Sequence, residues 1–217
     1  MLNLVFKDLL IQKKSFLIAI LYGAVFTVTF SNTSNPESIF IAVPSVIGYL
    51  FVTYACAYDD KNKSEIMLNS LPISRKDIVL SKYLSIVLYA IIGVCIAFIF
   101  TTAVKYLKFG NASRFMNLED VLGAFISITF LCSIYYPVYF KFGYLKSKYL
   151  SMFMLLGSFF IPAAIIEFVG KGNTADIIDY LSKVPEGILK ASVILILAVI
   201  LLASSLLSLR IYLKRDL

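Results

Sequence analysis

Residues able to do chemistry are few in this chain, and their spacing matches no catalytic or nucleotide-binding arrangement. Histidine is absent, which excludes His-based metal sites and Ser-His or Cys-His catalysis. The nearest approach to a phosphate-binding G-x-x-x-x-G-K-[ST] motif is the run Gly170–Thr174, which lacks the spacing needed to wrap phosphates. No paired Asp or Glu is visible at membrane depth, which disfavours an intramembrane enzyme. We therefore predict no catalytic, cofactor or metal site on this chain.

The most informative polar segment is the connector Asp59–Lys82, which links two long apolar stretches. Its residues Glu65–Leu71 suit a short helix with one apolar side, which Pro72 would end. Ser74 is placed to cap the next long helix, with Asp77 three residues later as in a short-armed capping box. A simple corner between two spans explains the segment equally well. The amount of exposed apolar and charged chemistry favours a surface that a cytoplasmic partner grasps.

The elements that position this connector belong to a membrane protein. The chain is 60% hydrophobic and 15% charged, with a mean hydropathy of +0.88, which is too apolar for a soluble domain of 217 residues. About 17 to 25 apolar residues cross a bilayer as a helix. We predict an all-α fold, a single transmembrane domain over 1–217 with six spans: 16–30, 39–58, 78–104, 121–140, 150–169 and 188–212.

Two further helices are expected outside the spans. Apolar residues recur with helical spacing over 1–14, which predicts an amphipathic helix in the membrane interface, although a plain extension of the first span fits as well. A short external helix, interrupted near Pro185, is predicted over 174–190.

Basic residues set the orientation. With six spans, 14 of the 20 Lys and Arg residues fall on one side and six on the other. Cytoplasmic segments carry an excess of Lys and Arg, so both termini and the connector are predicted to be cytoplasmic. The net charge of +7 is then a membrane-surface charge, and no soluble segment is long enough to bind nucleic acid.

The span interiors carry no charge in their apolar cores, which disfavours a proton- or ion-coupled transporter. An amphipathic or lipophilic cargo fits better, and Tyr135, Tyr136 and Tyr139 are candidates to line its path, although helix packing explains these rings equally well. Three prolines inside spans predict kinks or local breaks of open functional meaning: Pro44, Pro137 and Pro162.

The run from Glu65 to Tyr83, with S-L-P-I-S-R followed by I-V-L-S-K-Y, resembles the first cytoplasmic loop of ABC-2-type ATP-binding-cassette transporter permeases. It is more narrowly similar to the small branch that includes the permease of the phenol-soluble-modulin exporter and related antimicrobial-peptide efflux systems. The resemblance implies a homodimer that carries two separate ATPase subunits, which bind ATP and Mg. It implies these ATPase-coupling residues: Glu65, Leu68, Leu71, Pro72 and Arg75. It further implies that Lys82 and Tyr83, with the capping Ser74, anchor the third span.

These observations together predict the permease subunit of an exporter in the bacterial cell membrane, in contact with lipids and driven by ATP hydrolysed on another chain. The cargo would be an amphipathic peptide, a toxin or a lipophilic compound. The alternative is a non-transport membrane scaffold or sensor subunit whose connector binds a cytoplasmic regulatory partner.

Overall fold

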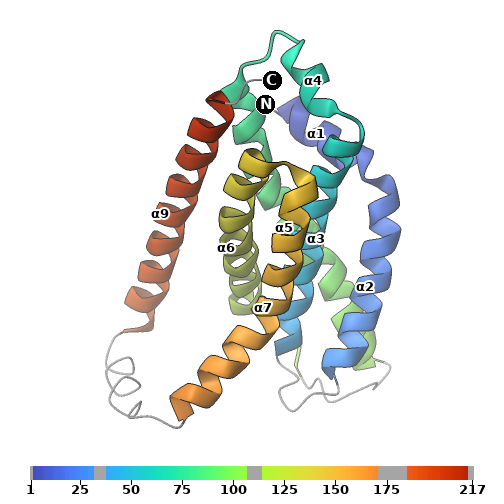
Figure 1. Cartoon of the computed structure of the whole chain (residues 1–217). Coiled ribbons are helices and arrows are strands. Elements are labelled where there is room, and N and C mark those ends of the chain that lie inside the picture. The colour runs from blue at the N-terminus through green and yellow to red at the C-terminus, as the bar shows by residue number, and fades with distance from the viewer. Residues whose placement is uncertain (1, 32–37, 107–113, 171–184, 215–217) are drawn as a thin grey trace.

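The computed structural model describes residues 2–31, 38–106, 114–170 and 185–214, and these ranges contain helices and no strand (Figure 1). The helices are α1 (Leu2–Ile11), α2 (Lys13–Ser31), α3 (Ile39–Lys61), α4 (Ser64–Asn69), α5 (Arg75–Tyr106), α6 (Leu118–Phe142), α7 (Tyr144–Gly170) and α9 (Glu186–Leu213). Each of the six predicted spans lies within one of the six long helices. The external helix expected over 174–190 falls mostly outside the described residues; α9 begins directly after Pro185.

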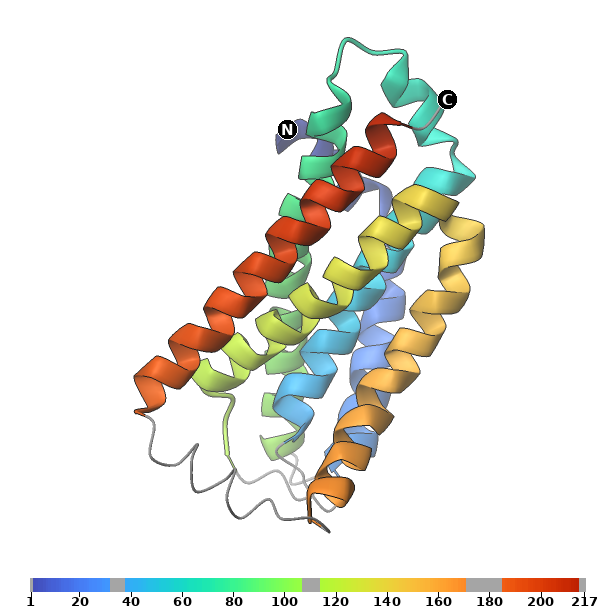
Figure 2. The same ribbon diagram turned by 60° about the vertical axis from the view of Figure 1, so that its left-hand side comes forward.

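The six long helices run alongside one another, and both short helices lie at the end of the bundle that carries the two termini (Figures 1 and 2). Four of them are long and apolar enough to cross a membrane: α3, α5, α6 and α9, with mean hydropathies of 2.0, 2.6, 1.8 and 2.7 in their most apolar windows. The bent pair α1–α2 makes a fifth candidate if it counts as one span. The count of six spans therefore stays a prediction.

Helix α3 is the centre of the bundle, whereas α9 lies at its periphery. In the apolar window of α3, 78% of the residues are buried, against 17% in α9. Helix α3 packs against α2, α5, α6 and α7, whereas α9 packs only against α5 and α6 among its main contacts. The lipid-facing sides of α9 explain its near-continuous Leu and Ile content.

Two glycines let α3 and α5 approach closely. A Cβ atom on Gly93 would lie 2.7 Å from the carbonyl oxygen of Pro44 and 3.1 Å from the backbone nitrogen of Gly48. Gly48 in turn faces Ile128 of α6, whose Cδ1 would be 2.7 Å from an added Cβ. Gly93 and Ala97, a small-xxx-small pair that could have served a dimer, are both buried within the chain.

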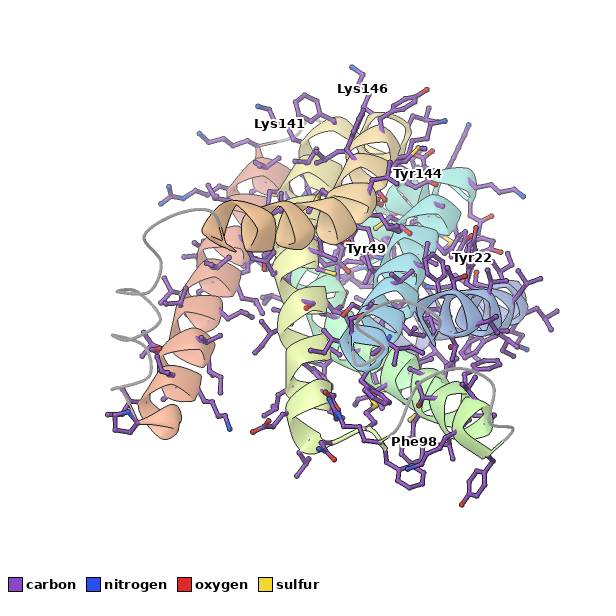
Figure 3. All side chains as sticks on the ribbon, turned by 90° about the horizontal axis from the view of Figure 1, so that it is seen from below. Tyr22, Tyr49, Phe98, Lys141, Tyr144 and Lys146 are labelled. Atoms are coloured by element: carbon purple, nitrogen blue, oxygen red, sulfur yellow. The ribbon has the colours of Figure 1, made fainter. Side chains whose placement is uncertain are left out.

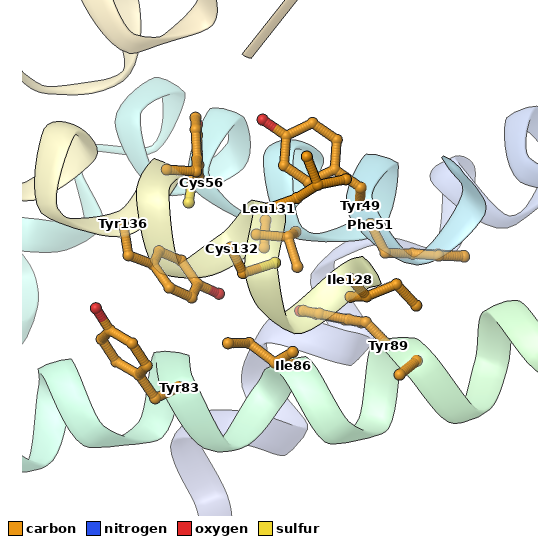
Figure 4. Packing of buried hydrophobic residues seen from close by; sticks show 14 of the residues in the cluster. Tyr49, Phe51, Cys56, Tyr83, Ile86, Tyr89, Ile128, Leu131, Cys132 and Tyr136 are labelled. Carbon is orange, nitrogen blue, oxygen red and sulfur yellow. The ribbon is translucent and has the colours of Figure 1, made fainter. Parts of the chain in front are cut away.

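Aromatic rings fill the core between α3, α5 and α6 (Figure 4). Tyr49, Tyr89, Tyr135 and Tyr136 are fully buried, and Tyr49 meets Tyr135 edge-on at a centroid distance of 5.9 Å. Edge-on and offset ring pairs are the preferred aromatic geometries. Cys56 and Cys132 fill small gaps in the same core as free thiols.

The helices α3 and α6 run unbroken through Pro44 and Pro137, so neither proline interrupts its helix. Pro162 lies inside α7, where its side chain is outside the described set. At the N-terminus, α1 is a separate helix at 69° to α2 rather than a straight extension of it. Its Phe6 and Leu10 are exposed, whereas Val5 and Asp8 are buried, and the position of α1 in the membrane interface stays a prediction.

The Gly93 contact predicts an effect on stability. Gly93→Ala is expected to lower the free energy of unfolding, because forcing α3 and α5 apart costs about 1–3 kcal/mol, which exceeds the gain in helix propensity of about 1 kcal/mol. The matched control is Gly187→Ala in α9, where nothing lies within 4 Å of an added Cβ. Thermal unfolding of the two purified variants in one detergent measures the difference. Equal midpoints would show that α3 and α5 are not in close contact at Gly93.

Candidate functional site

The connector between α3 and α5 forms two tight corners around α4. Lys63, at the start of α4, has a φ of 48° and is the one non-glycine residue with positive φ among those described. A left-handed lysine is uncommon and lets the chain reverse direction directly after α3. At the second corner, the Ser74 hydroxyl accepts a hydrogen bond of 3.1 Å from the Asp77 N–H, and α5 begins at Arg75. The predicted cap at Ser74 is therefore confirmed.

Helix α4 presents a different apolar side from the one implied by the resemblance. Ile66 and Met67 are 65% and 57% exposed, and Leu71 just beyond the helix is 46% exposed. Leu68, in contrast, is buried and belongs to the core of the bundle. Leu68 therefore does not lie on the surface that a partner could contact in this structure. The short helix turns its side chain inward, where it covers the end of the bundle.

The other implied coupling residues lie along the same segment. Pro72 is exposed and Arg75 is half-buried. The side chain of Glu65 lies outside the described set. The accessible apolar surface of this segment is therefore made by Ile66, Met67 and Leu71, which we call the α4 surface.

A closed ring of four charges, three of them buried and the fourth, Lys7, half-buried, lies at the base of the connector. The Lys82 ammonium of α5 is 2.6 Å from Asp8 Oδ2 of α1 and also contacts Asp59 Oδ2 of α3. The Lys7 ammonium is 3.1 Å from Asp8 Oδ1 and 3.1 Å from Asp59 Oδ1. Each of the four carboxylate oxygens thus has one ammonium partner, and the ring has no net charge.

The ring has a structural consequence. It joins α1, the end of α3 and the start of α5, which are the helices that carry both ends of the connector. Lys82 is only 4% exposed, and a buried charge is tolerated only when it is paired and hydrogen-bonded. The resemblance implied that Lys82 anchors the start of the third span; in the structure its amine points inward between two carboxylates. The sequence feature that comes closest to indicating this ring is Asp8, an acidic residue on the polar side of α1 for which no partner was predicted.

Tyr83 and Tyr136 attach this end of α5 to its neighbours. The Tyr136 hydroxyl donates a hydrogen bond of 3.0 Å to the Lys82 carbonyl. The Tyr83 hydroxyl lies 2.7 Å from Ser204 Oγ and 2.8 Å from Ser208 Oγ on α9. Because Ser204 donates its single hydrogen to the Ser133 carbonyl, the Tyr83 hydroxyl donates to Ser204 and accepts from Ser208. Tyr83 therefore ties α5 to α9, and the spacing of Ser204 and Ser208 by one helical turn was the unused sequence signal.

A cavity of about 360 Å³ lies beneath α4, between the ends of five long helices. Leu68 and Ile66 of α4 line one side, and Asp59 and Lys82 of the charge ring line another. Four aromatic residues from α6, α7 and α9 also line it: Tyr139, Phe140, Tyr144 and Tyr212.

The three tyrosines predicted to line a path separate into two groups. Tyr135 and Tyr136 are fully buried in the core and do not line the cavity beneath α4. Tyr139 is half-buried and lines the cavity beneath α4. A role for Tyr139 in contact with a ligand therefore has geometric support, and the role of the other two rings in a path stays a prediction.

A basic corner between α6 and α7 borders the same end of the bundle. Gly143 has a φ of 76°, a backbone conformation that favours glycine. It is the single residue between the end of α6 and the start of α7. Lys141 and Lys146 extend away from the bundle beside this corner (Figure 3). Such a corner is typical of the cytoplasmic side of a membrane protein.

Potential metal ligands are not clustered in the described ranges. No group of three potential His, Cys, Asp or Glu ligands lies together there. The two closest carboxylates, Asp8 and Asp59, are occupied by ammonium groups on all their oxygens.

Comparison with known proteins gives one match. The model of a family described as ABC-2 family transporter protein matches residues 3–213, nearly the whole chain. Neither the comparison with curated proteins nor that with solved structures returned a match.

The charge ring predicts a large effect of removing one member. Lys82→Met is expected to cost about 3 kcal/mol of unfolding free energy, because Asp8 and Asp59 stay charged and lose a partner in a buried site. Adding Asp8→Asn and Asp59→Asn to Lys82→Met should restore much of the loss. The control is Lys76→Met, an exposed lysine on the same helix. Denaturant unfolding followed by circular dichroism measures each variant; similar midpoints for Lys82→Met and Lys76→Met would contradict the burial of the ring.

Proposed function

Because the chain belongs to the ABC-2 transporter family, we propose that it is the permease of an exporter and that the α4 surface is where its ATPase subunits dock. The family is one of transporter membrane subunits, not of enzymes, and it implies association with ABC ATPase subunits. The observation that carries the proposal is the exposure of Ile66, Met67 and Leu71 on a polar connector outside the bundle.

The α4 surface has the chemistry of a docking site. Ile66 and Met67 are adjacent large apolar side chains, each more than half exposed, on a helix of only six residues. The helix lies at the end of the bundle (Figure 2). Lipid would cover an apolar surface along the sides of the bundle, but not one at its end. An amphipathic helix that fits a groove of a partner protein is a common mode of recognition.

The connection between α4 and the bundle suits the transfer of force. Both ends of the connector lead into helices that the charge ring joins, α3 through Asp59 and α5 through Lys82. A displacement of α4 would therefore act on α1, α3 and α5 together. ATP and Mg would bind to the ATPase subunits, two of which would serve a pair of permease chains.

The orientation in the membrane is inferred from charge, and the direction of transport from the resemblance alone. The end that bears α4 also bears the lysines of the α6–α7 corner and both termini, so we place it in the cytoplasm of a bacterial cell. The ATPases would contact this end, and export rather than import is proposed on the resemblance alone. An amphipathic peptide, a toxin or a lipophilic compound is the proposed cargo, on the strength of the resemblance to the phenol-soluble-modulin and antimicrobial-peptide branch.

The docking role of the α4 surface can be tested directly. The double variant Ile66→Ser, Met67→Ser is expected to abolish co-purification of the ATPase and to reduce transport at least tenfold. A tenfold weaker docking equilibrium corresponds to a loss of about 1.4 kcal/mol in binding free energy. The fold should persist, because both side chains point away from the core. Leu68→Asp is unsuitable for this purpose, since it would place a charge in the core.

The matched control is Leu145→Ser at the α6–α7 corner, since Leu145 is as exposed as Ile66, at 65% each. Pull-down of a candidate ABC ATPase subunit co-expressed with this chain, and its ATP hydrolysis, are measured for both variants. Retention of the ATPase by the α4 variant would refute the docking role. Capture of a different regulatory protein, with no ATPase bound by the unaltered chain, would favour a scaffold or sensor.

A further inference from the structure

We propose that the cavity beneath α4 is a binding site for the zwitterionic head group of an amphiphile, an ammonium group next to an anionic group. The cavity measures about 360 Å³, which is within the range of small-molecule sites and fits a head group rather than a whole lipid. It opens beside Asp60 and Lys63, which are exposed, and is closed at its base by the buried Lys82 and Tyr212.

The walls of the cavity favour an ammonium group. Tyr139, Phe140, Tyr144 and Tyr212 all line it, and aromatic faces attract cations, most strongly where water is excluded. The nearby Lys82 does not oppose this, because its charge is balanced by Asp8 and Asp59. An ammonium group in the cavity would therefore meet aromatic rings and no uncompensated positive charge at the base.

The rim supplies one charge of each sign. Asp60 and Lys63 are three residues apart where α3 turns into α4, and neither has an ion-pair partner among the side chains that the structure describes. Asp60 can attract the ammonium group and Lys63 the anionic group of the same head. With the ring neutral and these two charges opposite, the lining as a whole matches a zwitterion better than a purely cationic or anionic ligand.

The apolar part of the ligand also has a partner surface. Ile66, Leu68 and Ile78 line the cavity beside the aromatic rings. Two of these residues belong to α4, so an occupant would contact α4 on one side and the ends of α6 and α9 on the other. An effect of the bound ligand on ATPase docking rests on the proposed function. The binding of the ligand does not.

The absence of tryptophan from the chain allows a direct test. Tyr144→Trp places one fluorophore in the cavity wall, and Tyr149→Trp places one on the same helix at a position 63% exposed and outside the cavity. Each variant is placed in nanodiscs of phosphatidylglycerol and titrated with short-chain dihexanoylphosphatidylcholine or dihexanoylphosphatidylglycerol. We expect a saturable emission shift for Tyr144→Trp with the zwitterionic probe only, and none for Tyr149→Trp.

Charge variants sharpen the result. In the Tyr144→Trp background, Asp60→Asn should weaken binding about threefold to fivefold, the effect of one partly exposed ion pair, while Asp77→Asn, which is outside the cavity, should not. If Tyr144→Trp fails to fold, Tyr139→Trp serves as the reporter. Equal responses of the two reporters, equal binding of the anionic probe, or no response would each overturn the proposal.

The source of the ligand is decided by a second preparation. Nanodiscs of phosphatidylethanolamine that shift the emission of Tyr144→Trp without added probe would support a membrane lipid as the occupant. A shift only with the soluble probe would support an amphiphile from the aqueous phase. No ATPase is present in either assay, so a failure here is distinguishable from a failure of α4 docking.

Discussion

The pairing of Lys82 with Asp8 and Asp59 is the constraint on which this end of the molecule depends. A lysine that is almost fully buried requires carboxylates around it, and those carboxylates come from α1 and α3. Pairing of this kind adds little net stability over an apolar core, but a ring with each oxygen used once permits few alternative arrangements. The ring thus specifies how α1, α3 and α5 meet.

The surfaces with proposed functions follow from that arrangement. Because the ring holds the end of α3 near the start of α5, the connector must leave the bundle and return within a short distance. The left-handed Lys63 and the Ser74 cap make the two corners. What remains between them is α4, with Met67 outward, Leu68 inward over a cavity, and Ile66 both exposed and part of the cavity lining. One short helix thereby offers a docking surface to a partner and a wall to a ligand.

The parts of this structure that depend on neighbours in sequence were predictable. The helix ranges followed from hydropathy, and the Ser74 cap followed from a motif four residues long. The charge ring was not, because Lys82 and Asp8 are 74 residues apart and nothing local indicates that they meet. Leu68 was misplaced for a related reason: on a six-residue helix, the side that faces inward is decided by the bundle beneath it. The close approach of Gly93 in α5 to Pro44 in α3 was also not predictable from local sequence, because it joins two different helices.

The distance between α1 and α4 tests most directly whether the charge ring fixes the position of α4. Spin labels would be attached at Phe6→Cys and Met67→Cys, both exposed positions, in a chain whose three native cysteines are replaced by alanine. Pulsed electron paramagnetic resonance should give one narrow distribution of distances between the two labels. The distribution should become broad when Asp8→Asn removes one carboxylate of the ring. An unchanged, narrow distribution in the Asp8→Asn chain would contradict the account, because α4 would then be held without the ring.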